Sequence, residues 1–211
     1  MINLYNEDCL EAMKRMDDNS YELAIVDPPY GINIDGQKEH ISKVNPKYNR
    51  KYHEKKNWDS ERPSKKYFEE LIRVSKNQVI WGGNYFADLL SASRGWIYWD
   101  KGQQGLTMSD GELAWTSFNK PLRQIILNRC HISKYGGSIH PTQKPVALYT
   151  WILSKYAKEG DKILDTHLGS GSIAIACHNL GFDLDGYELD VDYYEAASKR
   201  LKEHQRQLKL F

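Results

Sequence analysis

The sequence predicts an α/β fold with a doubly wound, mainly parallel sheet, helices on both faces and an antiparallel edge. Short apolar runs rich in β-branched and aromatic residues alternate with longer segments of helical periodicity, which is the pattern of βα units. Two strand-like runs, 113–117 and 124–128, follow each other without a helix between them, which predicts antiparallel pairing at one edge. A chain of 211 residues can bury one core well, so residues 1–211 are interpreted as a single domain.

The individual elements follow from their periodicity. The predicted strands are apolar runs of four or five residues, namely 23–26, 78–81, 96–99, 113–117, 124–128, 162–165 and 184–188. The predicted helices repeat apolar residues at spacings of three and four, over 9–16, 66–74, 145–157, 172–180 and 192–208. Pro145 suits a helix start with Thr142 as its cap, and Gly181 stands where a left-handed cap is expected.

Composition excludes several classes of protein. The charges nearly cancel, with 29 Lys and Arg against 28 Asp and Glu, so net charge argues neither for nor against a nucleic-acid partner. Cys9, Cys130 and Cys177 lie far apart with no metal-ligand spacing, which predicts free thiols used in packing and no metal site. No apolar run approaches the roughly 20 residues that span a bilayer, and the N-terminus does not resemble a secretion signal. We therefore expect a soluble, unsecreted protein without a membrane partner.

Residues 31–66 are interpreted as a mobile basic loop. The segment has few aliphatic residues, and loops of this length are usually functional or disordered. Residues 37–66 contain ten basic residues and only four acids. The basic residues are Lys38, Lys43, Lys47, Arg50, Lys51, Lys55, Lys56, Arg62, Lys65 and Lys66. Such a loop is a candidate contact to DNA phosphates, with Tyr48, Tyr52 and Trp58 as stacking surfaces. The alternative is a solvated loop without a partner.

The tetrapeptide Asp27-Pro28-Pro29-Tyr30 follows directly after the predicted strand 23–26. The two prolines stiffen the backbone and withhold two N–H donors, so that carbonyl groups remain as acceptors beside the Asp27 carboxylate. An amino group on a planar base would donate its two hydrogens to Asp27 and to the Pro28 carbonyl, while Tyr30 stacks on the base. The alternative is an ordinary turn at the end of a strand.

A second turn has the character of a nucleoside site. The predicted strand 162–165 ends at Asp165 and leads through Thr166-His167-Leu168-Gly169-Ser170-Gly171 into a helix beginning at Ser172. Glycines at this turn admit a ligand close to the backbone, and Glu188, at the end of the next strand, stands where an acid binds ribose hydroxyls. A third glycine is absent, which favours a nucleoside without a pyrophosphate. S-adenosylmethionine fits this description.

Four motifs, taken in order, give the chain its family resemblance. Asp27 to Tyr30, then His140-Pro141-Thr142-Gln143-Lys144-Pro145, then Asp165 to Ser172, then Gly186-Tyr187-Glu188 resemble amino-group DNA methyltransferases of the β order, and small phage adenine methylases in particular. In that group the catalytic motif precedes the cofactor motif, as a circular permutation of the usual order. The resemblance covers nearly the whole chain and implies a Rossmann-like methyltransferase sheet.

The sequence departs from the family in two places. Many relatives begin the cofactor motif with Asp-Pro-Phe, where this chain has Asp165-Thr166-His167. Only 22 residues separate Ser117 from His140, where larger relatives insert a target-recognition region. We therefore expect no separate target-recognition domain.

The resemblance also implies a role for individual residues. The catalytic residues would be Asp27, Pro28, Pro29 and Tyr30. The cofactor-binding residues would be Asp8, Thr142, Lys144, Asp165, His167, Gly169, Ser170, Gly171, Ser172 and Glu188. Asp8 is expected near the cofactor adenine, although it could equally serve as a helix cap. Residues 80–86 resemble a family segment that helps to wall the pockets, with core packing as the alternative.

The function implied is transfer of a methyl group from S-adenosylmethionine to the N6 amino group of adenine in double-stranded DNA, with the target base flipped out of the helix. Cytosine N4 is the nearest alternative, and a non-catalytic nucleic-acid-binding partner is an alternative of another class. No covalent intermediate is required. The resemblance further suggests a restriction-modification role and a bacterial or phage-encoded cytoplasmic protein, and an aromatic edge strand at 115–118 suggests a possible homodimer.

Overall fold

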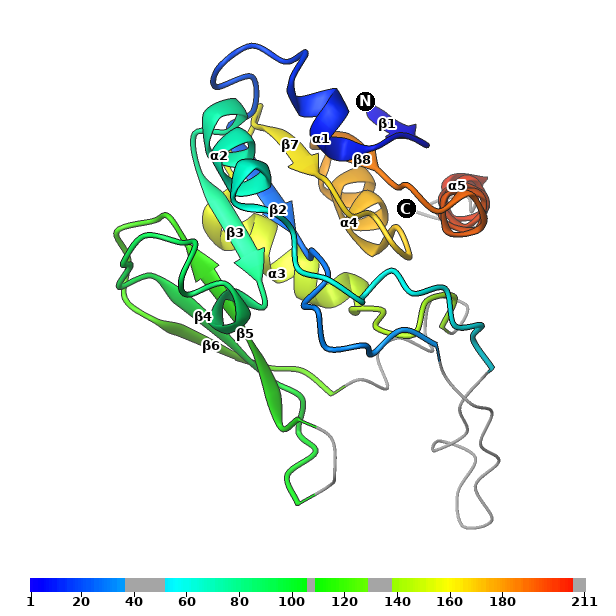
Figure 1. Cartoon of the computed structure of the whole chain (residues 1–211). Helices are drawn as coiled ribbons and strands as arrows, with labels where there is room; N and C mark the ends of the chain where they lie inside the picture. Colours follow the sequence, from blue (N-terminus) through cyan, green and yellow to red (C-terminus); the bar gives the residue numbers. More distant parts are fainter. Residues whose placement is uncertain (37–51, 106–108, 129–137, 207–211) are drawn as a thin grey trace.

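The computed structural model describes residues 1–36, 52–105, 109–128 and 138–206, and its strands form one mixed sheet (Figure 1). The eight strands lie in the order β1-β8-β7-β2-β3-β5-β4-β6. Their bounds are Ile2–Tyr5 for β1, Leu23–Val26 for β2, Gln78–Trp81 for β3, Trp96–Asp100 for β4, Gly111–Thr116 for β5, Arg123–Ile126 for β6, Lys162–Asp165 for β7 and Asp183–Tyr187 for β8. The predicted α/β class is confirmed.

The direction of the strands corrects the predicted antiparallel edge. Strands β1, β8, β7, β2 and β3 pair in parallel, and β5 runs antiparallel to both of its neighbours, β3 and β4. Because β3 and β4 occupy both sides of β5, the next strand, β6, adds to the outer side of β4 and runs parallel to it. The reversed strand is therefore internal to the sheet.

The position of β5 also removes the proposed dimer edge at 115–118. Both sides of β5 are already hydrogen-bonded within the sheet, and Trp115 is buried. A strand with two bonded neighbours has no free backbone groups to offer a second subunit. The prediction of an exposed aromatic edge was wrong because the sequence does not show which strand lies outermost.

Helices cover both faces of the sheet, as predicted (Figure 1). Side chains alternate along β2, so that Leu23 and Ile25 face one core and Ala24 and Val26 face the other. The first core is covered by α3 (Val146–Tyr156), α4 (Ser172–Leu180) and α5 (Val191–Arg206), and the second by α1 (Cys9–Met13) and α2 (Lys65–Val74). Strands buried on both faces explain the continuous apolar runs.

Several element boundaries differ from the prediction. The alternating strand β1 was not predicted, and it pairs with β8 at the edge of the sheet. Helix α1 ends at Met13, three residues early. Thr142 does not cap α3, because its hydroxyl lies 3.1 Å from the ring nitrogen Nδ1 of His140. Gly181 ends α4 with φ of 78°, which confirms the predicted left-handed cap.

No helix in the described ranges is long and apolar enough to cross a membrane.

The parallel strands bring the predicted motifs to one edge of the sheet. Strands β2, β7 and β8 end just before or at residues of those motifs, at Val26, Asp165 and Tyr187. Parallel strands have their carboxyl ends at the same edge, which is where ligands bind in open α/β sheets. This edge is the candidate active site.

Candidate active site

The catalytic turn begins where β2 leaves the core. All four residues of β2 are buried, and the chain then delivers Asp27 to the edge of the sheet. The Tyr30 hydroxyl donates to Oδ1 of Asp27 at 2.7 Å, and Nζ of Lys144 donates to Oδ2. Both carboxylate oxygens of Asp27 are thus engaged by side chains of the protein itself.

Asp27 is one end of a chain of four alternating charges. Nζ of Lys144 lies 3.0 Å from one Glu112 oxygen, and Nζ of Lys101 lies 2.6 Å from the other. The two lysine side chains are only 3% and 10% exposed. Buried charges are tolerated when they are paired. Two acids and two lysines balance here, and we call these four residues the ion quartet.

The pKa values of the ion quartet follow from burial and pairing. Burial raises the pKa of Asp27, and the ammonium group of Lys144 opposes this rise. Burial would raise the pKa of Glu112, but Lys144 and Lys101 outweigh it and lower that pKa to about 2. Burial would lower the pKa of Lys144, but Asp27 and Glu112 outweigh it and raise that pKa. Lys144 therefore stays charged and Glu112 ionised at neutral pH.

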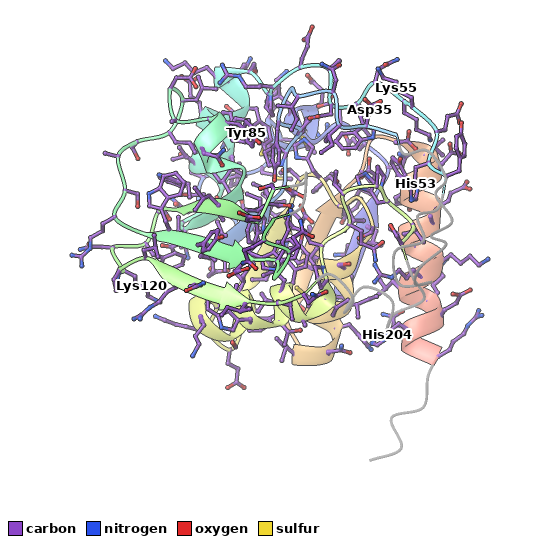
Figure 2. All side chains as sticks on the ribbon, turned by 90° about the horizontal axis from the view of Figure 1, so that it is seen from below. Asp35, His53, Lys55, Tyr85, Lys120 and His204 are labelled. Carbon is purple, nitrogen blue, oxygen red and sulfur yellow. The ribbon has the colours of Figure 1, made fainter. Side chains whose placement is uncertain are left out.

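A cavity of about 430 Å³ opens beside the catalytic turn. The residues lining it include Asp27, Pro28, Pro29, Tyr30, Ile34, Trp58, Tyr85, Glu112, Thr142 and Lys144. Its volume is within the range of small-molecule sites, which is about 300–1,000 Å³. The ring of Tyr85, labelled in Figure 2, stacks on that of Tyr30 with centroids 4.8 Å apart and planes 14° apart. An aromatic surface and a carboxylate therefore face one cavity.

Gly82 lets the Tyr30 ring take this place. Gly82 has φ of 70°, and a Cβ added there would lie 2.2 Å from Cε1 of Tyr30. Only glycine satisfies both demands without moving the ring. In the surrounding segment 80–86, Ile80, Trp81 and Phe86 pack in the core, as one interpretation of this segment has it. Gly82 and Tyr85 line the cavity, and a role in walling the target or cofactor pocket remains a prediction for them.

The second turn forms a separate corner of the same edge. Asp165 at the end of β7 is buried and accepts a hydrogen bond from the His167 backbone N–H at 3.1 Å. Burial raises the pKa of Asp165 to about 8. Gly169 and Gly171 have φ of 50° and 67°, and Glu188 accepts from the Gly169 N–H at 2.7 Å. The predicted glycine turn and the acid after β8 thus lie in direct contact.

The remaining residues of this corner surround that contact. The hydroxyls of Ser170 and Ser172 lie 3.1 Å apart at the start of α4. Asp8 caps α1 by accepting from the backbone N–H groups of Leu10 and Glu11, which confirms its interpretation as a cap. Burial lowers the pKa of His167 to about 4, and the charge of Asp8 opposes this. Asp8 therefore lies close enough to act on the same corner.

The structure divides the ten predicted cofactor residues between two places. Thr142 and Lys144 line the cavity with Asp27, whereas the other eight gather around the glycine turn or its rim. His140 lies between these places, with its ring 5.1 Å from that of Trp58 and 4.4 Å from that of Tyr193. Cofactor contacts remain predictions for all ten, and the position of Lys144 favours a role beside Asp27.

The described C-terminal part of the basic loop is held by acids. Nζ of Lys56 lies 2.8 Å from both carboxylate oxygens of Asp190, and Arg62 pairs with Asp88 at 2.8 Å. Tyr52 is exposed and Trp58 lines the cavity. Residues 37–51, with Tyr48, and the cysteine Cys130 lie outside the described residues, so the predicted mobility and DNA contact remain predictions.

The thiols that are described are poor nucleophiles. Burial raises the pKa of Cys9 to about 12, and burial also raises the pKa of Cys177. A protonated thiol is a weak nucleophile at neutral pH. Both residues therefore fit the predicted role in packing.

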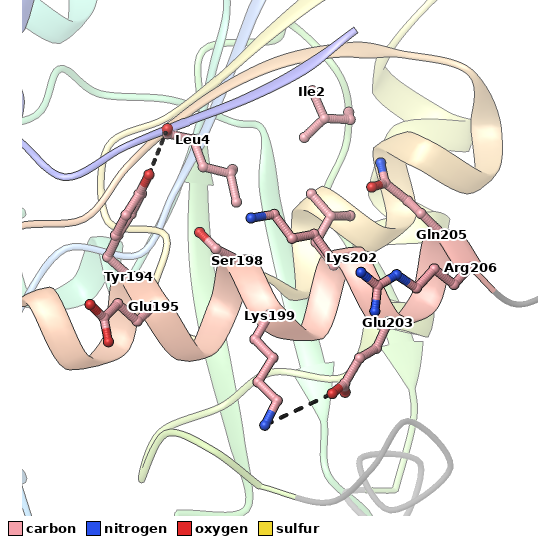
Figure 3. Close-up of a pocket in the computed structure, with 11 residues that line it drawn as sticks. Ile2, Leu4, Tyr194, Glu195, Ser198, Lys199, Lys202, Glu203, Gln205 and Arg206 are labelled. Atoms are coloured by element: carbon pink, nitrogen blue, oxygen red, sulfur yellow. Dashed lines mark hydrogen bonds and ion pairs between the residues drawn. The ribbon is translucent and has the colours of Figure 1, made fainter.

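A second hollow of about 610 Å³ lies between β1 and α5, away from the motifs (Figure 3). Ile2 and Leu4 of β1 form its base, and Tyr194 donates from its hydroxyl to the Leu4 carbonyl at 3.4 Å. No residue of the predicted site lines it. The candidate site is therefore the cavity at the carboxyl edge of the sheet.

Sequence comparisons point to one family. A family model described as DNA methylase, for the N6 and N4 enzymes, matches residues 97–199. The type II methyltransferase M.HpaI of Haemophilus parainfluenzae is 26% identical over 239 aligned positions, covering 91% of this chain and 71% of the relative. The aligned region is long enough to include both the catalytic and the cofactor motifs of this chain.

Structural comparisons agree on the fold. The M1.HpyAVI complex with SAM has a TM-score of 0.64 at 23% identity, covering 95% of this chain and all of that one. The cytosine-N4-specific PvuII DNA methyltransferase has a TM-score of 0.60 at 13% identity, covering 97% and 90%. Residues 97–199 thus match the family of the N6 and N4 DNA methylases, and the chain as a whole is similar in sequence and in fold to amino-group DNA methyltransferases.

Proposed function

We propose that this chain transfers a methyl group from S-adenosylmethionine to the N6 amino group of adenine in double-stranded DNA. The observation that carries the proposal is the cavity in which the Asp27 carboxylate and the Tyr30 ring face the same space, on the edge of the sheet that also carries the glycine turn. The target base would leave the helix to enter this cavity, at a cost of a few kcal/mol. Residues of the basic loop would contact phosphates, so binding should weaken as salt rises.

The corner at the glycine turn fits the proposed cofactor. A buried carboxyl group whose pKa is raised to about 8 is suited to a cationic ligand, and S-adenosylmethionine has an ammonium and a sulfonium group. Glu188 can receive ribose hydroxyls, and Gly169 and Gly171 carry no side chains to block the backbone. When bound, the cofactor supplies an electrophilic methyl group. The chain's own residues must then place the acceptor amine.

Rearrangement of Asp27 is part of the proposed mechanism. Both of its oxygens are occupied by the Tyr30 hydroxyl and Lys144, so an incoming amine must replace one of these donors. Lys144 is also held by Glu112, whereas the Tyr30 ring would turn to stack on the base. We infer that the Tyr30 hydroxyl leaves and that Asp27 and the Pro28 carbonyl then orient the amine. Positioning and electrostatics would supply most of the acceleration.

Substitutions of Tyr30 test this order of events. We expect Tyr30→Phe to keep methylation within a few-fold of the wild type, because the hydroxyl leaves Asp27 before transfer. Tyr30→Ala should lose about 10- to 100-fold, because base stacking on an aromatic ring contributes about 1–3 kcal/mol. Initial rates on one duplex measure both. Equal losses in the two variants would show that the hydroxyl, and not the ring face, is what the reaction needs.

Analysis of the methylated product identifies the base that accepts the methyl group. Labelled cofactor and mixed-sequence DNA, followed by digestion and nucleoside mass spectrometry, should yield N6-methyladenine. N4-methylcytosine would instead support the alternative acceptor, which uses the same geometry on another exocyclic amine. Cofactor binding without any methylated base would contradict the proposed function and favour a non-catalytic role.

Cofactor binding should depend on pH through Asp165. A cation binds the ionised carboxylate, so affinity should rise with pH until the pKa of about 8 is passed, and binding below that pH should release a proton. Calorimetry in two buffers of different ionisation enthalpy measures the release. Asp165→Asn should bind weakly without this proton release. Unchanged proton release in Asp165→Asn would assign the titration to another group.

Partners and location complete the proposal. If a homodimer forms, β6 is a better candidate edge than 115–118, because Leu122 and Ile126 are exposed there. Sedimentation of the wild type and of Ile126→Lys would test this. We further propose that the enzyme works in a bacterial or phage-infected cytoplasm as part of restriction-modification.

A further inference from the structure

Asp59 is a buried acid that binds the segment following the catalytic turn. The residue is fully buried, at 0% exposure. Its Oδ1 accepts from the backbone N–H groups of Tyr30 at 2.6 Å and Gly31 at 2.9 Å. Its Oδ2 accepts from those of Ile32 at 3.2 Å and Ile34 at 2.9 Å. One carboxylate thus collects four backbone donors from residues 30–34.

The two prolines of the catalytic turn make this contact important. Pro28 and Pro29 have no N–H, so Tyr30 carries the first backbone donor after Asp27. That donor goes to Asp59, together with those of the next residues. Hydrogen bonds to an ionised acceptor are shorter and stronger than neutral ones. The turn is therefore held by a residue that lies 29 positions away along the chain.

The segment that carries Asp59 is itself fastened to the rest of the protein. Lys56 binds both oxygens of Asp190, and its ammonium lies 4.9 Å from the centroid of the Tyr193 ring at the start of α5. The Lys56 backbone N–H also donates to Asp35 at 3.0 Å, but this contact lies within the basic loop itself and does not fasten it to another element. Figure 2 shows Asp35 and Lys55 close together, with His53 near the beginning of α5. Asp59 thus connects the catalytic turn to a segment that is bound, through Lys56, to Asp190 and to the start of α5.

We propose that Asp59 is a positioning residue for methyl transfer. Its carboxylate holds residues 30–34 so that the Tyr30 ring lies along the wall of the cavity and its hydroxyl meets Asp27. This inference rests on the proposed function. It gives the segment around Asp59, in the C-terminal part of the basic loop, a role in the reaction. The support is needed because the backbone of Tyr30 must stay in place while its ring turns and its hydroxyl leaves Asp27.

Asp59→Asn is the sharpest variant, because it keeps the shape of the side chain and turns one acceptor into a donor that faces backbone N–H groups. We expect its single-turnover methylation rate, at saturating DNA and cofactor, to fall by about 100-fold, as expected for an acceptor misplaced by about 1 Å. Cofactor affinity should remain within twofold, because the glycine turn does not contact Asp59. Hydrogen exchange of the amides of 30–34 should accelerate at least tenfold.

Asp35→Asn is the matched control. Asp35 is also a buried acid that accepts backbone N–H groups, those of Lys56 and Asn57, but it does not bind residues 30–34. We expect it to lower the melting temperature while leaving the single-turnover rate within a few-fold and the exchange of 30–34 unchanged. Comparison with Asp35→Asn therefore distinguishes general loosening of the loop from displacement of residues 30–34.

Two results would overturn the inference. A single-turnover rate for Asp59→Asn close to that of Asp35→Asn, at equal loss of melting temperature, would show a purely structural role. Unchanged exchange of the 30–34 amides would show that Asp59 does not hold the turn. If the wild type methylated no DNA, the proposed function would fail, and the exchange measurement would still decide whether Asp59 holds the turn.

Discussion

Methyl transfer should be lost when Asp27 is replaced by alanine, with the rate at saturating substrates falling by about 10³-fold or more, as for the removal of a principal electrostatic contact. The carboxylate is the acceptor around which the cavity is arranged, and both Tyr30 and Lys144 are held by it. Cofactor binding should survive, because the glycine turn and Glu188 keep their own contacts. The loss would therefore appear in the rate and not in cofactor affinity.

Three measurements on the same preparations decide the outcome for Asp27. Single-turnover methylation, cofactor calorimetry and thermal melting should be compared for the wild type, Asp27→Ala and Asp27→Asn. Glu69→Ala, an exposed acid on α2, serves as the control for removing a carboxylate. A methylation rate for Asp27→Ala within tenfold of the wild-type rate would show that Asp27 has no catalytic role. Loss of cofactor binding together with the methylation rate would show that the glycine turn depends on Asp27 for its own binding.

Lys144→Met should destabilise the protein by about 3–5 kcal/mol, the cost typical of breaking a buried ion pair by removing one partner. Its ammonium is the cation between Asp27 and Glu112, and without it Glu112 keeps only Lys101 while Asp27 loses its ion-pair partner. At neutral pH the variant would carry one uncompensated buried negative charge. Denaturant unfolding at pH 7 measures the loss.

The pH dependence of Lys144→Met follows from the same charges. Without Lys144, burial dominates and raises the pKa of the facing carboxyls above their unfolded values, so the variant's stability should fall as pH rises through those raised values. Its deficit relative to the wild type should therefore shrink as pH is lowered from 7 toward 5. A deficit that is independent of pH would point to lost packing instead of lost charge.

A second substitution tests whether charge is the cause. In Lys144→Met/Glu112→Gln the remaining charges of the ion quartet, Asp27 and Lys101, balance again. We expect the double variant to recover part of the stability at pH 7 while remaining slow in methylation. Additive losses from the two substitutions would show that the quartet does not act as a unit.

Local patterns in the sequence were sufficient to predict the part of the site that depends on strand ends. The run 23–26 is apolar on both faces, so a buried parallel strand was expected, and Asp27 had to leave it at the carboxyl edge. The glycine turn and Glu188 followed in the same way from the ends of β7 and β8. Parallel strands bring such ends together whatever the connections between them.

The parts that were not predicted depend on long-range pairing. Glu112 reaches the cavity only because β5 runs against its neighbours and begins at the edge where they end. No local pattern specifies that reversal, and Lys101 likewise has no signature of its own. Asp59 escaped notice because its partners are backbone N–H groups, which every residue other than proline possesses.

The pairing of β1 with β8 has a consequence for how the enzyme is made. Ile2 lies opposite Leu184, so β1 leaves the ribosome long before the strand with which it pairs. Strand β2 can join β3 early, but β7, on its other side, also comes late. Domains form during synthesis from the segments already available, and distant pairings are slow to close. A nascent chain can therefore assemble the proposed pocket for the base before the glycine turn exists, and it becomes able to use its cofactor only after β7 and β8 have been made.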